Sequence, residues 1–133
     1  MIQLTVYGTP KPQGSTRAFI PKGWKRAIIT ADNKQLKPWR QEISAAALAF
    51  QKAAAPYYEA PQSIDLRFFF ARPKSAKRRR EMTVRPDLDK ISRSVLDALT
   101  GILFRDDAAV VKMSASKAYG EPERVEITLE AIV

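Results

Sequence analysis

The sequence predicts an α+β fold, in which a small mixed or antiparallel sheet of about four strands packs with two α-helices. Several segments alternate apolar and polar residues with a period of two, as strands with one buried face do. Two longer segments repeat apolar residues at steps of three and four, as helices that bury one side do. The order is strands, helix, strand, loop, helix, strand, strand. This order predicts an α+β sandwich with both helices on one face of the sheet.

Four segments are the predicted strands, namely residues 2–7, 64–70, 110–119 and 124–132. Between the first of them and the first helix, the segments 17–20 and 26–30 are also β-like and are separated by the turn residues PKGW. They predict a hairpin that exposes three basic side chains, those of Lys22, Lys25 and Arg26.

The first predicted helix covers residues 37–55, where apolar residues recur at helical steps around an alanine-rich middle. The second begins near Leu88, with Asp87 in position to cap it, and ends at Gly101. Its apolar stripe faces a core, and the residues spaced by four on its other side are Asp89, Arg93 and Asp97. We interpret Asp97 as a structural residue.

At 133 residues, 45% of them hydrophobic, the chain is expected to form a single domain over residues 1–133. No run approaches the roughly 20 apolar residues that span a bilayer, and the first residues do not resemble a signal peptide, so we expect a cytoplasmic protein without a membrane partner. The chain has no Cys and no His, which excludes disulfides and any mechanism based on a histidine base or a cysteine nucleophile.

The net charge of +9 is concentrated in two segments, as binding to a polyanion requires. Residues 1–40 and 72–93 carry most of the basic excess, and we expect DNA as the partner. Residues 72–86 are predicted to form a solvated, mobile basic loop that becomes ordered when it binds phosphates. The predicted DNA-binding residues are Arg78, Arg79, Arg80, Arg85 and Lys90, together with the three basic residues of the hairpin.

Four carboxylates lie at the two ends of the second predicted helix: Asp87 and Asp89 before it, Asp106 and Asp107 after it. Mg²⁺ prefers oxygen ligands, usually one or two carboxylates with phosphate and water, so these residues predict a magnesium site of a nuclease. If Asp107 begins an extended segment, its side chain diverges from that of Asp106, and one of the two faces the site. The alternative is structural, with carboxylates that cap a helix, favour its positive end and form a turn.

The segment RPDLDKISRSVLDALTGILFRDDAAVV, residues 85–111, resembles the RusA family of Holliday-junction resolvases, small endodeoxyribonucleases of bacteria and their prophages. The resemblance implies a magnesium-dependent homodimer that cuts four-way junctions by paired nicks. It places the first two catalytic aspartates on Asp87 and Asp89 and the third on Asp107, with Asp106 beside it. The family's lysine falls on Arg93, which can bind phosphate or stabilise charge but cannot transfer a proton.

Two other functions stay open for the same residues. One is a catalytically silent, structure-specific DNA-binding protein whose aspartates are structural. The other is a general metal-dependent nuclease for flaps or single strands, which shares the carboxylates but not the preference for a four-way junction.

Overall fold

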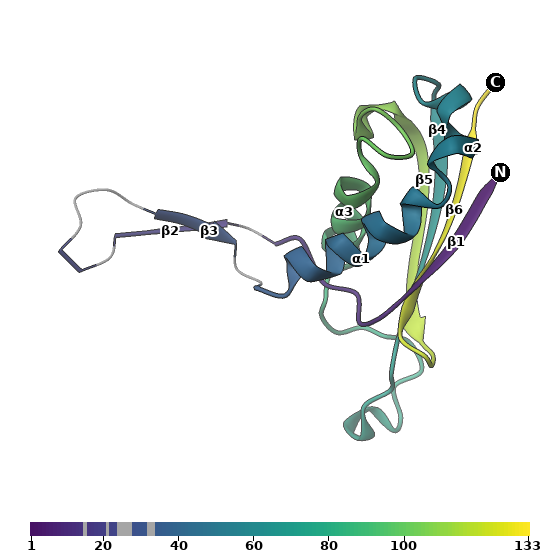
Figure 1. Ribbon diagram of the computed structural model, residues 1–133. Coiled ribbons are helices and arrows are strands. Elements are labelled where there is room, and N and C mark those ends of the chain that lie inside the picture. Colours follow the sequence, from purple (N-terminus) through teal and green to yellow (C-terminus); the bar gives the residue numbers. More distant parts are fainter. Residues whose placement is uncertain (15, 21, 24–27, 32–33) are drawn as a thin grey trace.

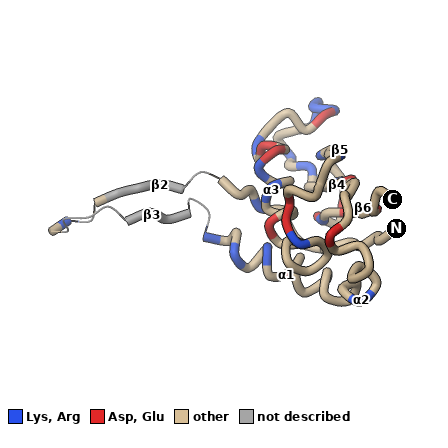
Figure 2. The backbone as a smooth tube through the Cα atoms, turned by 90° about the horizontal axis from the view of Figure 1, so that it is seen from above, with Lys and Arg blue, Asp and Glu red and all other residues tan. Residues whose placement is uncertain are grey.

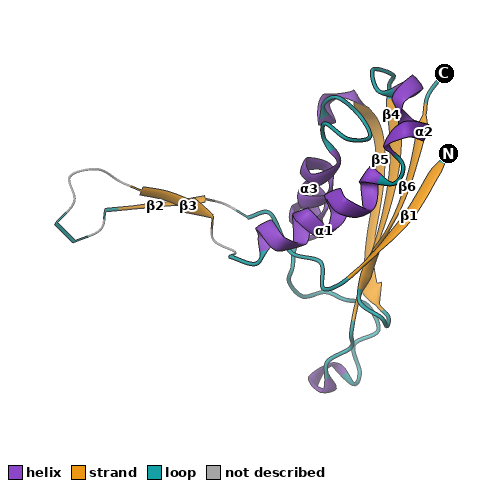
Figure 3. Ribbon diagram, viewed as in Figure 1, coloured by secondary structure: helices purple, strands orange, loops and turns teal. Residues whose placement is uncertain are grey.

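A four-stranded mixed sheet is the centre of the structure (Figures 1 and 3). The computed structural model describes residues 1–14, 16–20, 22–23, 28–31 and 34–133. The sheet has the order β1-β6-β4-β5, with strands β1(Ile2–Tyr7), β4(Gln62–Phe70), β5(Val110–Tyr119) and β6(Arg124–Ala131). β4 pairs parallel with β5, and the other two pairings are antiparallel. The predicted α+β class and the four strands are confirmed.

The helices lie on one face of this sheet, as predicted (Figure 1). α1(Leu36–Leu48) and α3(Leu88–Leu99) contact each other; α1 also contacts β1, and α3 contacts β5. The strand side chains under the helices are buried, for example every second residue of β4 from Ile64 to Phe70. Because α3 contacts β5, it lies over the β5 side of the sheet.

The single helix predicted for residues 37–55 is wrong beyond Leu48. α1 ends there, and after a turn at Ala49 and Phe50 the chain forms the short helix α2(Gln51–Ala54) and the 3₁₀ turn η1(Ala55–Tyr57). Phe50, at this break, is partly buried and packs against the core.

α3 agrees with the prediction in position, because it begins at Leu88 and Asp87 is its N-cap residue. Beyond its end, Gly101 adopts φ +83°, a conformation that glycine adopts without steric cost. The chain then turns inward, and Leu103 and Phe104 are fully buried. These two side chains anchor the segment that carries Asp106 and Asp107.

The predicted hairpin is present as β2(Thr16–Phe19) and β3(Ile28–Ala31), which pair antiparallel in a separate two-stranded sheet. In Figure 1 it lies to one side of the helices and the main sheet. Lys22 is exposed in its turn. Lys25 and Arg26 lie outside the described residues.

The basic segment 72–86 is less polar in its contacts than its sequence indicates. We expected it to bury nothing, but Ala76 and Met82 are buried. A 3₁₀ turn, η2(Lys74–Ala76), and hydrogen bonds from the Arg72 guanidinium to the Ala76 and Arg79 carbonyl oxygens give it local structure. Mobility of this segment stays a prediction.

Candidate nuclease site

Asp87 and Asp89 stand at the N-terminal end of α3, and both side chains are exposed. We expected the Asp87 side chain to cap the helix, but it accepts no capping hydrogen bond. Its carboxylate instead lies 3.6 Å from the ammonium of Lys90 and is half-exposed. An exposed ion pair of this kind contributes little to stability, so the Asp87 carboxylate remains available to a ligand.

Asp106 and Asp107 form a turn between α3 and β5. Asp107 begins the 3₁₀ turn η3(Asp107–Ala109), and the Asp106 side chain caps it by accepting a hydrogen bond of 3.2 Å from the Ala108 N–H. The condition for diverging side chains, an extended segment at Asp107, is therefore not met. The two carboxyl groups interact with each other instead.

This interaction moves the two pKa values apart. Hydrogen bonding with the Asp106 carboxyl, desolvation, and repulsion by Asp106 and Asp97 raise the pKa of Asp107. The Ala108 N–H is the main cause that lowers the pKa of Asp106. Two neighbouring acids that resist ionising together are a favourable environment for a cation, whose charge removes the repulsion.

The two pairs of aspartates do not meet within one chain. Within the described part of the chain, no three acidic side chains lie close enough together to surround one metal ion. α3 has 12 residues, so its two ends are about 18 Å apart at the helical rise of about 1.5 Å per residue. The oxygen donors suit Mg²⁺ in their chemistry, and a single chain offers them as two separate pairs.

Asp97 of α3 acts electrostatically on Asp107. We interpreted Asp97 from the sequence as a structural residue and did not anticipate this effect. Asp97 raises the pKa of Asp107, so its charge acts at that carboxylate. Its ion-pair partner is Arg40 of α1, at 3.9 Å. The spacing of four from Asp89 through Arg93 places these three side chains on one face of the helix, but it does not indicate that Asp97 is near Asp107.

Basic residues surround the acidic positions on and after α3 (Figure 2). Arg93 is exposed and has no ion pair within the described residues, so its guanidinium can contact a phosphate. Lys90 is held by Asp87. The segment that leads to the hairpin is fixed to α3, because the Gln13 N–H donates to the Lys90 carbonyl at 2.9 Å and the Ser94 hydroxyl donates to the Lys11 carbonyl at 2.9 Å.

The three arginines of the basic segment differ in their surroundings. Arg78 and Arg80 are exposed, as is Arg85. The Arg79 guanidinium donates a hydrogen bond of 3.0 Å to the Tyr119 hydroxyl, and the Arg72 guanidinium lies over the Tyr119 ring, 4.4 Å from its centroid. Arg79 therefore fixes the segment to the end of β5, whereas Arg78 and Arg80 face solvent.

Lys117 of β5 holds the chain directly before Asp87. Its ammonium donates hydrogen bonds to the carbonyl oxygens of Val84, at 2.6 Å, and of Pro86, at 2.8 Å. Two charge-assisted hydrogen bonds on neighbouring carbonyls restrict the position of Asp87. A single lysine in a strand gives no sequence signal of this role.

Replacing Lys117 by Met is expected to reduce the nuclease activity that the sequence predicts by roughly 10- to 100-fold, because small displacements of a reacting group have effects of this size. DNA affinity should change little, and Lys117→Arg should restore most of the rate because it keeps the donors. The measurement is single-turnover cleavage together with a binding titration. Lys112→Met, on the same strand and exposed, is the matched control. A similar loss in the control would show a general charge effect.

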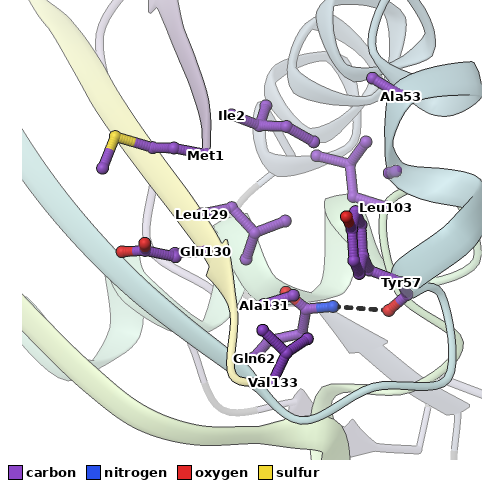
Figure 4. A pocket seen from close by; sticks show the side chains of 11 residues that line it. Met1, Ile2, Ala53, Tyr57, Gln62, Leu103, Leu129, Glu130, Ala131 and Val133 are labelled. Atoms are coloured by element: carbon purple, nitrogen blue, oxygen red, sulfur yellow. Dashed lines mark hydrogen bonds between the residues drawn. The ribbon is translucent and has the colours of Figure 1, made fainter.

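Several pockets lie among the described residues, and two of them bear on the location of the site. One, of about 300 Å³, is lined mainly by apolar side chains from both chain ends and the α2 region, with the Gln62 side chain donating to the Tyr57 carbonyl (Figure 4). None of the predicted site residues lines it. Another pocket, of about 370 Å³, is lined in part by Arg85 and Pro86, which directly precede Asp87 of the candidate site.

No helix within the described residues is long and apolar enough to cross a membrane. Comparison with known proteins shows a match over residues 8–130 to the family described as Endodeoxyribonuclease RusA. The chain is also similar to the uncharacterized protein YqaN of Bacillus subtilis (strain 168), with 31% identity over 142 residues, which cover 98% of this chain and 96% of that protein.

Proposed function

The chain belongs to the RusA endodeoxyribonuclease family, and from this premise we propose that it resolves four-way (Holliday) DNA junctions by paired symmetric nicks in DNA recombination and repair. The observation that carries the proposal is the family match over residues 8–130, which includes every exposed carboxylate at the two ends of α3. Basic residues beside these carboxylates suit a DNA backbone. We further propose that the protein acts as a homodimer in the cytoplasm.

We propose Mg²⁺ as the cofactor, with Asp87, Asp89, Asp107 and Asp106 as the residues that would hold it. When bound, such an ion polarises the scissile phosphate, activates water and stabilises the leaving oxygen. A chain without histidine has carboxylates as its strongest donors for this purpose.

The other side chains bind and orient the DNA. Arg93 contacts a phosphate and stabilises its charge, and it does not transfer a proton because guanidinium stays protonated. Arg78, Arg80 and Arg85 extend the phosphate contacts along the 72–86 segment. Lys22, Lys25 and Arg26 of the hairpin, with Lys90, complete the proposed DNA-binding set.

The dimer follows from the geometry of the substrate. Productive resolution of a four-way junction needs two symmetric cuts, and a two-fold dimer supplies two equal sites and twice the basic surface.

A competition experiment tests the function. Purified protein is given equal amounts of labelled four-way, flap and linear DNA with Mg²⁺. We expect the four-way junction to be cut first, with nicks at two symmetric positions. Preferential cutting of the flap or of single strands would favour the general nuclease, and binding without cutting in any divalent metal would favour the catalytically silent DNA-binding protein.

Replacing Arg78 and Arg80 by Ala should weaken junction binding and reduce the salt dependence of the binding constant by a slope of about two, because about 0.9 is lost for each phosphate contact. The measurement is a titration at several salt concentrations. The double variant Lys52→Ala, Arg67→Ala changes the net charge equally at exposed positions outside the basic segment and serves as control. Equal slopes in both variants would exclude a specific role of the segment.

A further inference from the structure

The pocket of about 370 Å³ lies directly beside the start of the candidate nuclease site. Its walls come from the segment after β1, the ends of β4 and β5, and the basic segment 72–86. Two of its lining residues, Arg85 and Pro86, immediately precede Asp87 in the chain. Figure 1 shows the segment after β1 and the basic segment at the same end of the sheet, away from both chain ends. A molecule in this pocket would therefore lie beside Asp87.

The lining of the pocket is mainly apolar. Phe70 and Met82 contribute buried side chains, and Val84 is 38% exposed. Proline rings fix their own backbone φ angles, so a wall that contains them has little conformational freedom to lose when a ligand binds. Four prolines belong to the lining, namely Pro10, Pro12, Pro73 and Pro86.

Hydrogen bonds hold the walls of the pocket in place. On one side, the Gly8 N–H donates to the Glu123 carbonyl at 3.0 Å, and the Lys11 carbonyl accepts from the Ser94 hydroxyl of α3. On the other side, the Lys117 ammonium holds the carbonyl of Val84. The pocket is therefore built before any ligand arrives, which lowers the entropic cost of binding.

The charged side chains of the lining favour an anionic ligand group at its edge. The carboxylate of Glu123 is occupied by the protein, because its two oxygens accept hydrogen bonds from the Thr9 hydroxyl at 2.5 Å and from the Ala71 N–H at 3.0 Å. Lys11 and Arg85 also line the pocket, and neither has an ion pair among the residues that the structure describes. Arg85 is exposed, so its guanidinium can contact a phosphate in solvent.

The Tyr119 ring gives the pocket an aromatic surface. Its hydroxyl accepts the hydrogen bond from Arg79, and the Arg72 guanidinium lies over the ring. These two contacts fix the orientation of a side chain that is half-buried and lines the pocket. Nucleobases stack on such rings with little dependence on sequence, because every base has a π face.

We propose that this pocket receives one nucleobase, displaced from the base stack at the branch point of the DNA, while Lys11 and Arg85 contact the phosphate of the same nucleotide. The proposal rests on the proposed function and assigns a nucleobase subsite beside Asp87. The pocket volume is at the lower end of the roughly 300–1,000 Å³ found for small-molecule sites, which suits one base rather than a base pair.

A nucleotide matches both parts of the pocket. Its base is flat and largely apolar on its faces, as the lining requires, and its phosphate is an anion, as the two cations require. An isolated phosphate would leave the apolar lining unused, and an apolar side chain of another protein would leave the cations unused. Stacking is interrupted at a branch point, which lowers the cost of displacing a base there.

A fluorescent base tests the proposal without any strand being cut. The adenine analogue 2-aminopurine is placed, one position at a time, at the nucleotides that flank the branch point of a four-way junction, and its fluorescence rises when it leaves its stacked neighbours. The protein is titrated into each junction in excess chelator. We expect an increase at one position on each symmetric strand. No increase at any position, with the junction bound, would overturn the proposal.

Two pairs of variants locate the displaced base in the pocket. Val84→Asp puts a charge into the apolar lining, whereas Thr83→Asp adds the same charge at an exposed neighbour that does not line the pocket. Tyr119→Leu removes the ring, whereas Tyr119→Phe removes only the hydroxyl that contacts Arg79. We expect the increase to be lost in the first variant of each pair and kept in the second. An increase that persists in both Val84→Asp and Tyr119→Leu would place the base elsewhere and overturn the proposal.

An abasic site measures how much the base contributes to binding. At the position where 2-aminopurine responds, removing the base should weaken binding of the junction by roughly 5- to 100-fold, the usual range for loss of one stacked base. The same abasic junction should bind Tyr119→Leu no more weakly than the intact junction does. An unchanged affinity of the wild-type protein for the abasic junction would contradict a base in the pocket.

The results also separate this proposal from the proposed function. A protein that cuts the junction in Mg²⁺ but shows no fluorescence increase in chelator would overturn the nucleobase subsite and leave the nuclease function intact. A protein that shows the increase and its loss in Val84→Asp, but cuts no DNA in Mg²⁺, would support the subsite and count against the nuclease function.

Discussion

Replacing Asp87 by Asn is expected to lower magnesium-dependent cleavage of a four-way junction by about 100-fold or more. Metal ions contribute several kcal/mol of transition-state stabilisation, and each 1.36 kcal/mol lost is about a factor of ten in rate. Asp107→Asn should have an effect of the same size, because the proposed site needs ligands from both pairs. Affinity for the junction should be retained or increase slightly, since a negative charge that faces the phosphates is removed.

The matched control is Asp65→Asn. Asp65 is on β4, accepts hydrogen bonds from Arg67 and Ser114, and lies on the face of the sheet opposite to the helices. The amide oxygen can still accept from Arg67, and the amide NH2 can donate to the Ser114 hydroxyl, so fold and activity should persist. Cleavage rates and binding constants of the three variants, measured side by side, separate a catalytic effect from a structural one. Full activity in either Asp87→Asn or Asp107→Asn would contradict the assignment.

Replacing Phe104 by Ala should reduce the free energy of unfolding by about 3–5 kcal/mol, as is usual when a buried phenyl group is removed. Phe104 is fully buried, and its backbone carbonyl accepts a hydrogen bond of 2.8 Å from the Gly101 N–H in the turn after α3. Chemical denaturation followed by circular dichroism measures the change. Because Phe104 lies two residues before Asp106, surviving folded protein should also lose cleavage activity.

Leu48→Ala is the control for this loss of stability. Leu48 is 55% exposed at the end of α1, so its truncation should change the free energy of unfolding by only about 0.5 kcal/mol. A comparable loss in the two variants would show that Phe104 is not a central part of the core.

Much of the fold follows from patterns in the sequence. The strands at 2–7, 64–70, 110–119 and 124–132 and the helix after Asp87 agree with the structure within a residue or two at most ends. These elements are strongly periodic, and their buried faces leave little freedom of register. The extent of the first helix was wrong because the alanine-rich segment favours a helix throughout, so local propensity does not indicate the break after Leu48.

The sequence indicates candidate site residues, which stay a prediction, but it does not indicate how they are arranged in space. The positions of Asp87, Asp89 and Asp107 along the sequence can be identified directly. Their distance from one another in space depends on the length of α3 and on the turn that Phe104 anchors. The sequence also gave no indication that Lys117 supports Pro86 or that Asp97 acts on Asp107, because both contacts join residues that are brought together only by packing.

The most direct test of the nuclease function is one incubation of the purified protein with an end-labelled four-way junction, in Mg²⁺ and in excess chelator. We predict paired nicks at symmetric positions in Mg²⁺ and an intact junction in chelator. A junction that is bound but stays uncut in Mg²⁺ and in every other divalent metal tried would contradict the proposal.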